Sequence, residues 1–362
     1  MSDKEQKLGE IRQRIDAIDR QLQELINERA RCAQEVARVK AEAGDDTAFY
    51  RPEREADVLR RIQQRNRGPL SNEEIARLFR EIMSACLALE EVLTIAFLGP
   101  EGTFTQAAAL KHFGHSVRTR PLPAIDEVFR EVESGAAHYG VVPVENSTEG
   151  VINHTLDMFM RSPLKICGEV ELRIHHHLMN REGTMEGIER VYSHQQSLAQ
   201  CREWLDRNLP KAERVAVSSN SEAARRAAED PAAAAIAGET AAEIYGLAIV
   251  VRNVEDEPDN TTRFLVIGRH PVGRSEADKT SLLLSAQNRA GTLYRLLVPF
   301  VENEISLTRI ESRPSRRGMW DYVFFVDLEG HMDDPQVARA LEQLEQEASL
   351  FKILGSYPRA VL

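Results

Sequence analysis

Apolar residues recur at helical spacing along the first forty residues. Between about residue 8 and residue 40 no proline interrupts them, and there is no glycine after Gly9. A helix of this length measures about 50 Å at 1.5 Å per residue, which is more than one small domain can cover. We therefore expect a helix of a second copy of the chain to lie against this stripe. The stripe consists of Ile11, Ile15, Ile18, Leu22, Leu25, Ile26, Cys32, Val36 and Val39.

Two further helices complete an all-α module of three helices over residues 1–93. One begins near Pro52, because proline favours an early helical position, and ends before the Gly-Pro pair at 68–69. The other begins at Ser71, where a Ser-x-x-Glu capping box stands, and runs to about Val92.

From residue 94 to residue 270, strand patterns alternate with helical patterns. This alternation is typical of an α/β domain, either in one piece or as two lobes with a cleft between them. The predicted strands cover residues 94–99, 139–143, 169–176, 190–192, 233–237 and 263–268. The predicted helices cover residues 105–113, 124–133, 198–207, 221–228 and 239–245.

The rest of the chain consists of a polar linker, residues 271–279, and a third domain, residues 280–362. Its patterns follow the order β-α-β-β-α-β, which is that of the ferredoxin-like fold. The predicted elements cover residues 280–286, 291–302, 306–311, 320–328, 335–347 and 352–357.

Composition excludes several classes of protein. The 362 residues include 46 basic and 57 acidic side chains, a net charge of −11 that argues against a nucleic-acid partner. No stretch approaches 18 apolar residues, so we expect no membrane span. The N-terminus is charged where a signal peptide would be apolar, and the four cysteines form no CxxC pair. These features predict a cytoplasmic protein without a zinc site or a disulfide framework.

Charged residues stand at distinctive places in the helical module. Arg29 and Lys40 leave the same face of the first helix, and Arg12 lies about a quarter turn away from it. Together with the residues around them they resemble the all-helical chorismate mutase domain. The matching pattern is Arg12-x2-Ile15-x2-Ile18-Asp19, Leu25-Ile26-x2-Arg29, Lys40, Arg54-Glu55 and Cys86-x3-Glu90.

The resemblance implies roles for these residues. Chorismate rearranges without a covalent enzyme step, and negative charge grows on its ether oxygen, so catalysis needs carboxylate clamps and hydrogen-bond donors. Lys40 and Glu90 would flank the ether oxygen, and Glu55 would hold the hydroxyl group. The remaining substrate-binding candidates are Arg29, Arg12 acting in the neighbouring subunit, Arg54, Arg51 where the family often has Asp, and Cys86 where Ser is common.

Four polar clusters follow strands of the middle domain, where ligands bind α/β sheets. They are Gly99–Thr105, Val142–Gly150, Tyr192–Gln196 with Gln200, and Asn260–Phe264. In this order they resemble prephenate dehydratase, and Thr-Arg-Phe at 262–264 is the most specific element. The resemblance implies two α/β lobes like those of a type II periplasmic binding protein, with the substrate in the cleft.

Dehydration of prephenate removes the ring hydroxyl and the carboxylate together, so the leaving hydroxyl must be hydrogen-bonded or protonated. By the resemblance, Thr262 lies at that hydroxyl. Asn146, Ser193 and Gln200 would be polar contacts, Thr103, Thr105 and Arg263 would bind carboxylates, and Phe264 completes the motif. Three consecutive histidines at 175–177 do not predict a metal site, since neighbours on a strand point to opposite faces. We expect no cofactor and no metal.

Two segments of the last domain suit an amino-acid ligand. Asn288–Leu293 leads into a helix N-terminus that can receive a carboxylate, and Glu311 can receive an ammonium group. They resemble an ACT domain that binds phenylalanine. The implied site comprises Asn288, Gly291, Thr292, Leu293, Glu311, Ser312, Arg313 and Pro314.

Nearly the whole chain thus resembles the bifunctional P-protein family, chorismate mutase/prephenate dehydratase with an ACT domain. The resemblance implies chorismate and prephenate as substrates, feedback by phenylalanine, and a homodimer or a larger homo-oligomer. Two alternatives stay open at this stage. One is a prephenate dehydratase with a non-catalytic mutase-like domain, and the other is a cytosolic ligand-binding protein.

Overall fold

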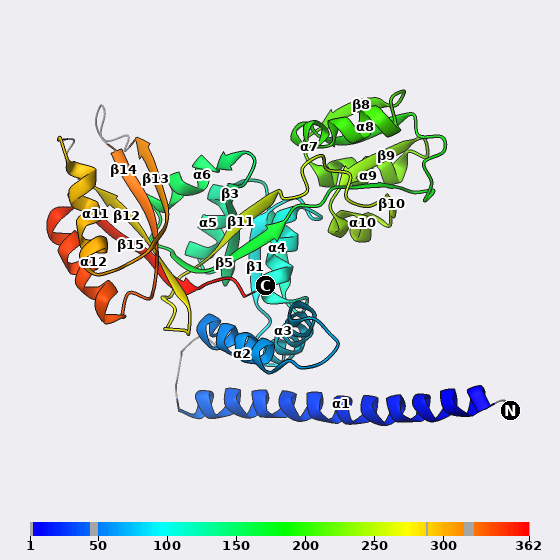
Figure 1. The fold of residues 1–362 in the computed structure, drawn as a ribbon, viewed down its shortest axis with the longest axis horizontal. Helices are drawn as coiled ribbons and strands as arrows, with labels where there is room; N and C mark the ends of the chain where they lie inside the picture. The colour runs from blue at the N-terminus through cyan, green and yellow to red at the C-terminus, as the bar shows by residue number, and fades with distance from the viewer. Residues whose placement is uncertain (1–2, 44–49, 287–288, 315–321, 362) are drawn as a thin grey trace.

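The computed structural model describes residues 3–43, 50–286, 289–314 and 322–361. Three bodies follow one another along the chain: a helical module, a two-lobed α/β body and a C-terminal sheet with two helices (Figure 1). The three predicted architectures are therefore confirmed. No helix in the described part of the chain is long and apolar enough to cross a membrane.

The helical module contains α1 (Asp3–Glu42), α2 (Pro52–Arg65) and α3 (Asn72–Ala88). Helices α2 and α3 pack together, while α1 extends as a long rod beyond the rest of the molecule (Figure 1). The apolar stripe of α1 is open to solvent, and Leu25 is 60% exposed. The capping hydrogen bond at Ser71 is present, with its Oγ accepting from Glu74 N.

The prediction that α3 reaches Val92 is wrong. The helix ends at Ala88, and the N–H groups of Leu89 and Glu90 bond three residues back, to Cys86 O and Leu87 O. The last turn tightens in this way because the chain must extend into a strand at Thr94. Glu90 therefore lies in a turn and not on the face of a helix.

The first lobe is a mixed sheet with the strand order β2-β1-β3-β11-β5, with β4 paired to β3. Strands β1, β2 and β3 are parallel, whereas β11 runs antiparallel to both of its neighbours. The strands are β1 (Thr94–Leu98), β2 (Arg118–Leu122), β3 (Tyr139–Asn146), β4 (Gly150–Val151), β5 (Lys165–Arg173) and β11 (Thr261–Gly268). The helices are α4 (Phe104–Phe113), α5 (Ile125–Glu133) and α6 (Asn153–Phe159).

The second lobe has the strand order β10-β6-β9-β7-β8. The predicted helix over 198–207 is in fact two helices, because the backbone of Cys201 leaves the helical region (φ −116°, ψ 17°). The strands are β6 (His177–Asn180), β7 (Arg190–His194), β8 (Glu213–Val217), β9 (Ala233–Ala237) and β10 (Ala248–Val251). The helices are α7 (Gln195–Gln200), α8 (Arg202–Asn208), α9 (Asn220–Glu229) and α10 (Glu239–Tyr245).

The chain crosses between the lobes twice, after β5 and before β11. The two crossings run side by side, since Ile174 N donates to Asn260 O and Val254 N donates to His176 O, each at 2.8 Å. The strand predicted over 169–176 ends at Arg173, so the histidine run begins in the first crossing. A hinge of two adjacent segments thus joins the lobes.

The C-terminal domain has the predicted β-α-β-β-α-β order and the strand order β13-β14-β12-β15. Its helices lie on the side of the sheet away from the first lobe (Figure 1). The other face packs on that lobe, where Leu283, Phe325 and Leu354 join the core formed by Val142 and Ile267. The elements are β12 (Asp278–Ser285), α11 (Thr292–Glu302), β13 (Leu307–Pro314), β14 (Tyr322–Glu329), α12 (Pro335–Glu347) and β15 (Leu350–Pro358).

Candidate active sites and effector site

Thr262 and Asn146 form a hydrogen-bonded pair at the ends of adjacent strands. They are register partners on β11 and β3, and Asn146 Nδ2 donates to Thr262 Oγ1 at 2.8 Å. Asn146 Oδ1 accepts from the N–H groups of Thr148 and Glu149, which fixes the orientation of the amide. Because Thr262 Oγ1 accepts from Asn146, its own proton remains available to another group.

A polar chain extends from this pair across the two lobes. Asn146 Nδ2 also donates to Asn260 Oδ1 at 2.7 Å, and Asn260 Nδ2 lies 3.4 Å from Gln200 Oε1. Gln200 belongs to the second lobe, and its Nε2 donates to Glu149 Oε1 of the first lobe at 3.2 Å. Gln200 and Asn260 also line a cleft of about 480 Å³ between the lobes. The chain of amides thus joins Thr262 to this cleft.

His176 supports Gln200 from the hinge. Its Nε2 lies 2.8 Å from Gln200 Oε1, and since that oxygen only accepts, Nε2 carries the proton. Burial lowers the pKa of His176, so the ring is neutral at pH 7. The histidine run therefore contributes to positioning a cleft residue.

The other predicted dehydratase residues lie in different surroundings. Thr103 is the N-cap of α4, and Thr105 is buried in the first turn of that helix. The Ser193 hydroxyl is fully buried, 2.7 Å from Ile236 O and 3.0 Å from Asn220 Oδ1. Phe264 is a core residue between α4 and the sheet. The hydroxyl groups of Thr103 and Ser193 are thus occupied by contacts within their own lobes.

Arg263 is not placed as the sequence analysis expects. It was expected to bind a substrate carboxylate, but its side chain does not face the cleft. Its Nε donates to Glu169 Oε2 at 3.0 Å, and its Nη1 donates to Asp327 Oδ2 at 2.6 Å. Successive residues of a strand point to opposite faces, so Arg263 points away from the side on which Thr262 meets Asn146.

In the helical module, cations of α1 lie close to two carboxylates. Burial raises the pKa of Glu55, while Arg80 and Arg29 oppose this shift. Burial likewise raises the pKa of Glu90, and Lys40 and Arg29 oppose it. Arg29 therefore acts electrostatically on both carboxylates, and Lys40 acts on Glu90, at the end of α1 that holds these two cations.

Arg12 and Arg51 do not join this cluster, whereas Arg54 directly precedes Glu55 on α2 and Cys86 lies on α3, four positions before Glu90. Arg12 is 17 positions from Arg29, or about 26 Å along the same helix. Arg51 precedes α2 and pairs with Glu53, and Arg54 is exposed. Cys86 is buried, with 3% of its surface exposed. Arg12 and Arg29 of one chain therefore cannot contact the same small molecule.

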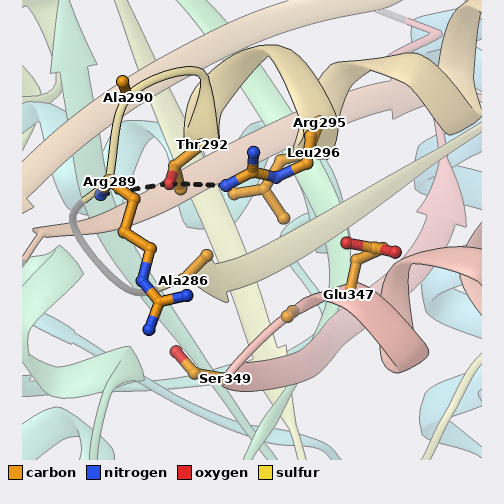
Figure 2. Close-up of a pocket in the computed structure, with 9 residues that line it drawn as sticks. Ala286, Arg289, Ala290, Thr292, Arg295, Leu296, Glu347 and Ser349 are labelled. Atoms are coloured by element: carbon orange, nitrogen blue, oxygen red, sulfur yellow. Dashed lines mark hydrogen bonds between the residues drawn. The ribbon is translucent and has the colours of Figure 1, made fainter.

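The loop between β12 and α11 borders an open cavity of about 670 Å³ (Figure 2). Thr292 Oγ1 accepts from Arg289 N and from Arg295 Nη2, each at 3.3 Å. Gly291 has a positive φ of 81°, which permits the sharp entry into the helix. Asn288 lies outside the described residues, and Leu293 is 41% exposed.

The second predicted effector segment, Glu311–Pro314, lies on β13 and does not line this cavity. Strand β14 separates β13 from β12 in the sheet. Arg313 contacts α6 of the first lobe instead, with Nη2 donating to Asp157 Oδ1 at 2.7 Å. Among the described residues of one chain, the two segments therefore do not form a single pocket.

Comparison with known proteins identifies the family. Family sequence models match three successive segments, described as chorismate mutase type II (residues 11–91), prephenate dehydratase (95–272) and ACT domain (280–346). A relative from Pseudomonas aeruginosa, named bifunctional chorismate mutase/prephenate dehydratase, is 60% identical over 366 residues and covers 100% of both chains. The chain belongs to this family of bifunctional enzymes.

Two further relatives extend the comparison. A protein of the same name from Aquifex aeolicus is 45% identical over 361 residues and covers 99% of both chains. The structure of a prephenate dehydratase in complex with L-Phe from Arthrobacter aurescens is 35% identical, with a TM-score of 0.68. It covers 74% of this chain, and the match takes in 90% of that chain.

Sequence reasoning missed four residues that support these sites: Arg80, Glu149, His176 and Asn260. Arg80 Nε lies 3.0 Å from Glu55 Oε1, and its Nη1 donates to Lys111 O at the end of α4. A lone arginine on a helix gives no signal of this role. Asn260 and Glu149 lie inside the polar clusters that the sequence shows. Their closeness in sequence to Thr262 and Asn146 could have identified them as residues of the site.

Proposed function

We propose that this chain converts chorismate to prephenate in its helical module and prephenate to phenylpyruvate at the cleft of the α/β body. The polar chain of Thr262, Asn146, Asn260 and Gln200 across the two lobes is the observation that carries the second activity. It supplies neutral hydrogen-bonding groups to a polar substrate in the place where α/β folds bind ligands.

For the rearrangement, Lys40 and Glu90 act at the ether oxygen of chorismate, and Arg29 binds a carboxylate. Arg29 acts to lower the pKa of both Glu55 and Glu90, and Lys40 acts to lower that of Glu90. These effects support a site in which two cations receive a dianionic substrate. Arg80 holds Glu55 in place, which leaves the other carboxylate oxygen for the substrate hydroxyl. Donors placed where negative charge grows stabilise the transition state more than the ground state.

For the dehydration, Thr262 donates a hydrogen bond to the ring hydroxyl. The C–O bond breaks as this hydroxyl takes up one proton from the solvent and leaves as water. The carboxylate leaves as carbon dioxide, and the electron pair of its C–C bond enters the ring, which becomes aromatic. Asn146 fixes the Thr262 hydroxyl, and Gln200 contacts the substrate from the second lobe.

The mutase site takes residues from two chains in a homodimer. The exposed apolar stripe of α1 needs a partner helix, and Arg12 lies too far from Arg29 to act in the same site. We expect Arg12→Ala and Arg29→Ala each to lose mutase activity, and an equal mixture, refolded together, to recover about one quarter of wild-type activity. Half of the dimers are then mixed, and each has one intact site.

Two measurements control this complementation. Mixing the variants without refolding keeps the chains unexchanged and should give no recovery, while the dehydratase activity of both variants should equal that of the wild type. If the refolded mixture stays inactive, Arg12 and Arg29 do not meet across an interface.

Phenylalanine acts as the effector at the ACT domain. The cavity in Figure 2 offers the cations Arg289 and Arg295 for a carboxylate and the anion Glu347 for an ammonium group. A bound L-Phe is named for the Arthrobacter aurescens relative. Glu311 and Ser312 of another chain can complete such a site, since ACT domains usually pair.

Incubation with chorismate tests the whole proposal. The chain should form prephenate and then ultraviolet-absorbing phenylpyruvate, and phenylalanine should slow the second step. A dehydratase with an inert mutase module would form phenylpyruvate when it is given prephenate but not when it is given chorismate. A ligand-binding protein would bind both compounds and convert neither.

A further inference from the structure

Arg263 ties the catalytic strand β11 to the regulatory sheet. It directly follows Thr262, and its side chain is only 12% exposed. Its Nη1 donates to Asp327 Oδ2 at 2.6 Å, and its Nη2 donates to the Tyr357 hydroxyl at 3.1 Å. Asp327 and Tyr357 belong to β14 and β15 of the ACT domain. The residue next to Thr262 is thus held by a different domain as well as by Glu169 of its own lobe.

A second ion pair repeats this arrangement on the neighbouring strand. Glu145 directly precedes Asn146 on β3, and its Oε2 lies 3.0 Å from Arg309 Nε on β13. Arg263 and Glu145 are register partners in the first lobe, and Arg309 and Asp327 are register partners in the ACT sheet. We call these four residues the interdomain quartet. Its charges alternate in sign and sum to zero.

The quartet lies directly behind the pair at the cleft. Since strand neighbours point to opposite faces, Thr262 and Asn146 face one side of the sheet while Arg263 and Glu145 face the other. The register of β11 and β3 shifts immediately after Arg263, so the ladder that would otherwise fix this point is interrupted. The ion pairs of the interdomain quartet therefore contribute more to the positions of Thr262 and Asn146 than side-chain contacts contribute in a regular sheet.

The ion pairs are well supported on the ACT side. Ser281 Oγ donates to Asp327 Oδ1 at 2.5 Å. Burial would raise the pKa of Asp327, but Arg263 beside it brings the pKa below its usual range, so Asp327 is ionised at pH 7. Separating the partners of a buried ion pair is strongly unfavourable, so the pairing persists when either sheet moves by a small amount.

We propose that the interdomain quartet holds Thr262 and Asn146 in their catalytic positions, and that Arg263 and Glu145 are positioning residues and not substrate ligands. The inference rests on the proposed role of Thr262 in the dehydration. It makes the ACT sheet a structural part of the dehydratase site, reached through residues adjacent to the reacting groups.

The test is kinetic and uses the full chain. Arg309→Gln and Glu145→Gln each remove the Glu145–Arg309 ion pair, in which the carboxylate side chain is 38% exposed and the arginine side chain 12% exposed, and Asp327→Asn removes the Arg263–Asp327 pair from the ACT side. Each should lower dehydratase kcat by about ten- to hundredfold through misplacement of Thr262, with KM within about twofold. The double variant Arg309→Gln/Glu145→Gln should lose no more than either single variant. Mutase activity should not change.

The matched control is Asp157→Asn. It weakens the ion pair between Arg313 and α6, which joins the same two domains away from Thr262. This variant should keep wild-type dehydratase kcat. Thermal unfolding of all variants checks that activities are compared below the unfolding transition.

Three outcomes overturn the inference. They are a kcat within twofold of wild type in the quartet variants, an equal kcat loss in Asp157→Asn, and a loss confined to KM, which would make Arg263 or Glu145 a substrate ligand. Thr262→Ala separates this failure from failure of the proposed function. If Thr262→Ala is inactive while the quartet variants are unaffected, only the quartet inference fails. If Thr262→Ala is fully active, the proposed dehydratase site itself is wrong.

Discussion

Thr262→Ala should reduce dehydratase kcat by about 10²- to 10³-fold, the loss typical of removing one donor from a transition-state site. Asn146 Nδ2 donates to Thr262 Oγ1 at 2.8 Å, which leaves the hydroxyl proton free for the leaving group. Alanine removes the hydroxyl, which donates to the leaving group and accepts from Asn146, together with one methyl group. The measurement is phenylpyruvate formation from prephenate by the purified chain.

Thr262→Ser is the matched control, since it keeps the hydroxyl and should retain most of the activity. Mutase activity should be the same in both variants, because α1, α2 and α3 form a separate body. A dehydratase rate near that of the wild type in Thr262→Ala would contradict the assignment of the donor.

The second large effect concerns the pH dependence of the mutase. The ether oxygen of chorismate only accepts hydrogen bonds, so Glu90 must be protonated to donate to it. Burial raises the pKa of Glu90 above its usual range, against the opposing effect of Lys40 and Arg29. Wild-type mutase kcat should therefore be constant at low pH and fall about tenfold per pH unit above this raised pKa.

Glu90→Gln keeps a donor at every pH and should remove this fall. Two pH units above the pKa of Glu90, the variant should exceed the wild type by up to about a hundredfold. The measurement is mutase kcat against pH for both proteins. The proposed donor role is excluded by a wild-type profile without an alkaline fall, and equally by a variant that is impaired to the same extent at all pH values.

The sequence predicted the main polar cluster of the dehydratase site but also assigned to it a residue, Arg263, that does not face the cleft. Polar residues after β3, in α7 and at the start of β11 were expected to converge, and Asn146, Gln200 and Thr262 are joined through Asn260. The motif also assigned Arg263 to the cleft. Strand alternation, which is visible in the sequence, already implies that Thr262 and Arg263 face opposite sides.

The strands that the sequence did not predict lie mostly at sheet edges. β2 ends the first sheet, and β8 and β10 end the second. An edge strand is covered on fewer sides, so it needs fewer apolar residues, and β2 (Arg-Thr-Arg-Pro-Leu) has a single aliphatic side chain, whereas the short edge strand β10 (Ala-Ile-Val-Val) is entirely apolar. β6 was missed for another reason, since its start is hidden in the histidine run. Tertiary position, and not local pattern, decides such segments.

The core shared by the first lobe and the ACT sheet sets an order for folding during synthesis. The second lobe is continuous from His177 to Val251, so it can complete its own core as soon as that stretch is available. The first lobe begins at Thr94, but part of its core is Leu354 and Tyr357. Its hydrogen bonds to the end of the chain span about 190 residues, as between Lys352 Nζ and Phe159 O, and contacts of such long range form slowly. We therefore expect the inserted lobe to fold first, and the lobe that surrounds it in the sequence to complete its core after β15 has been synthesised.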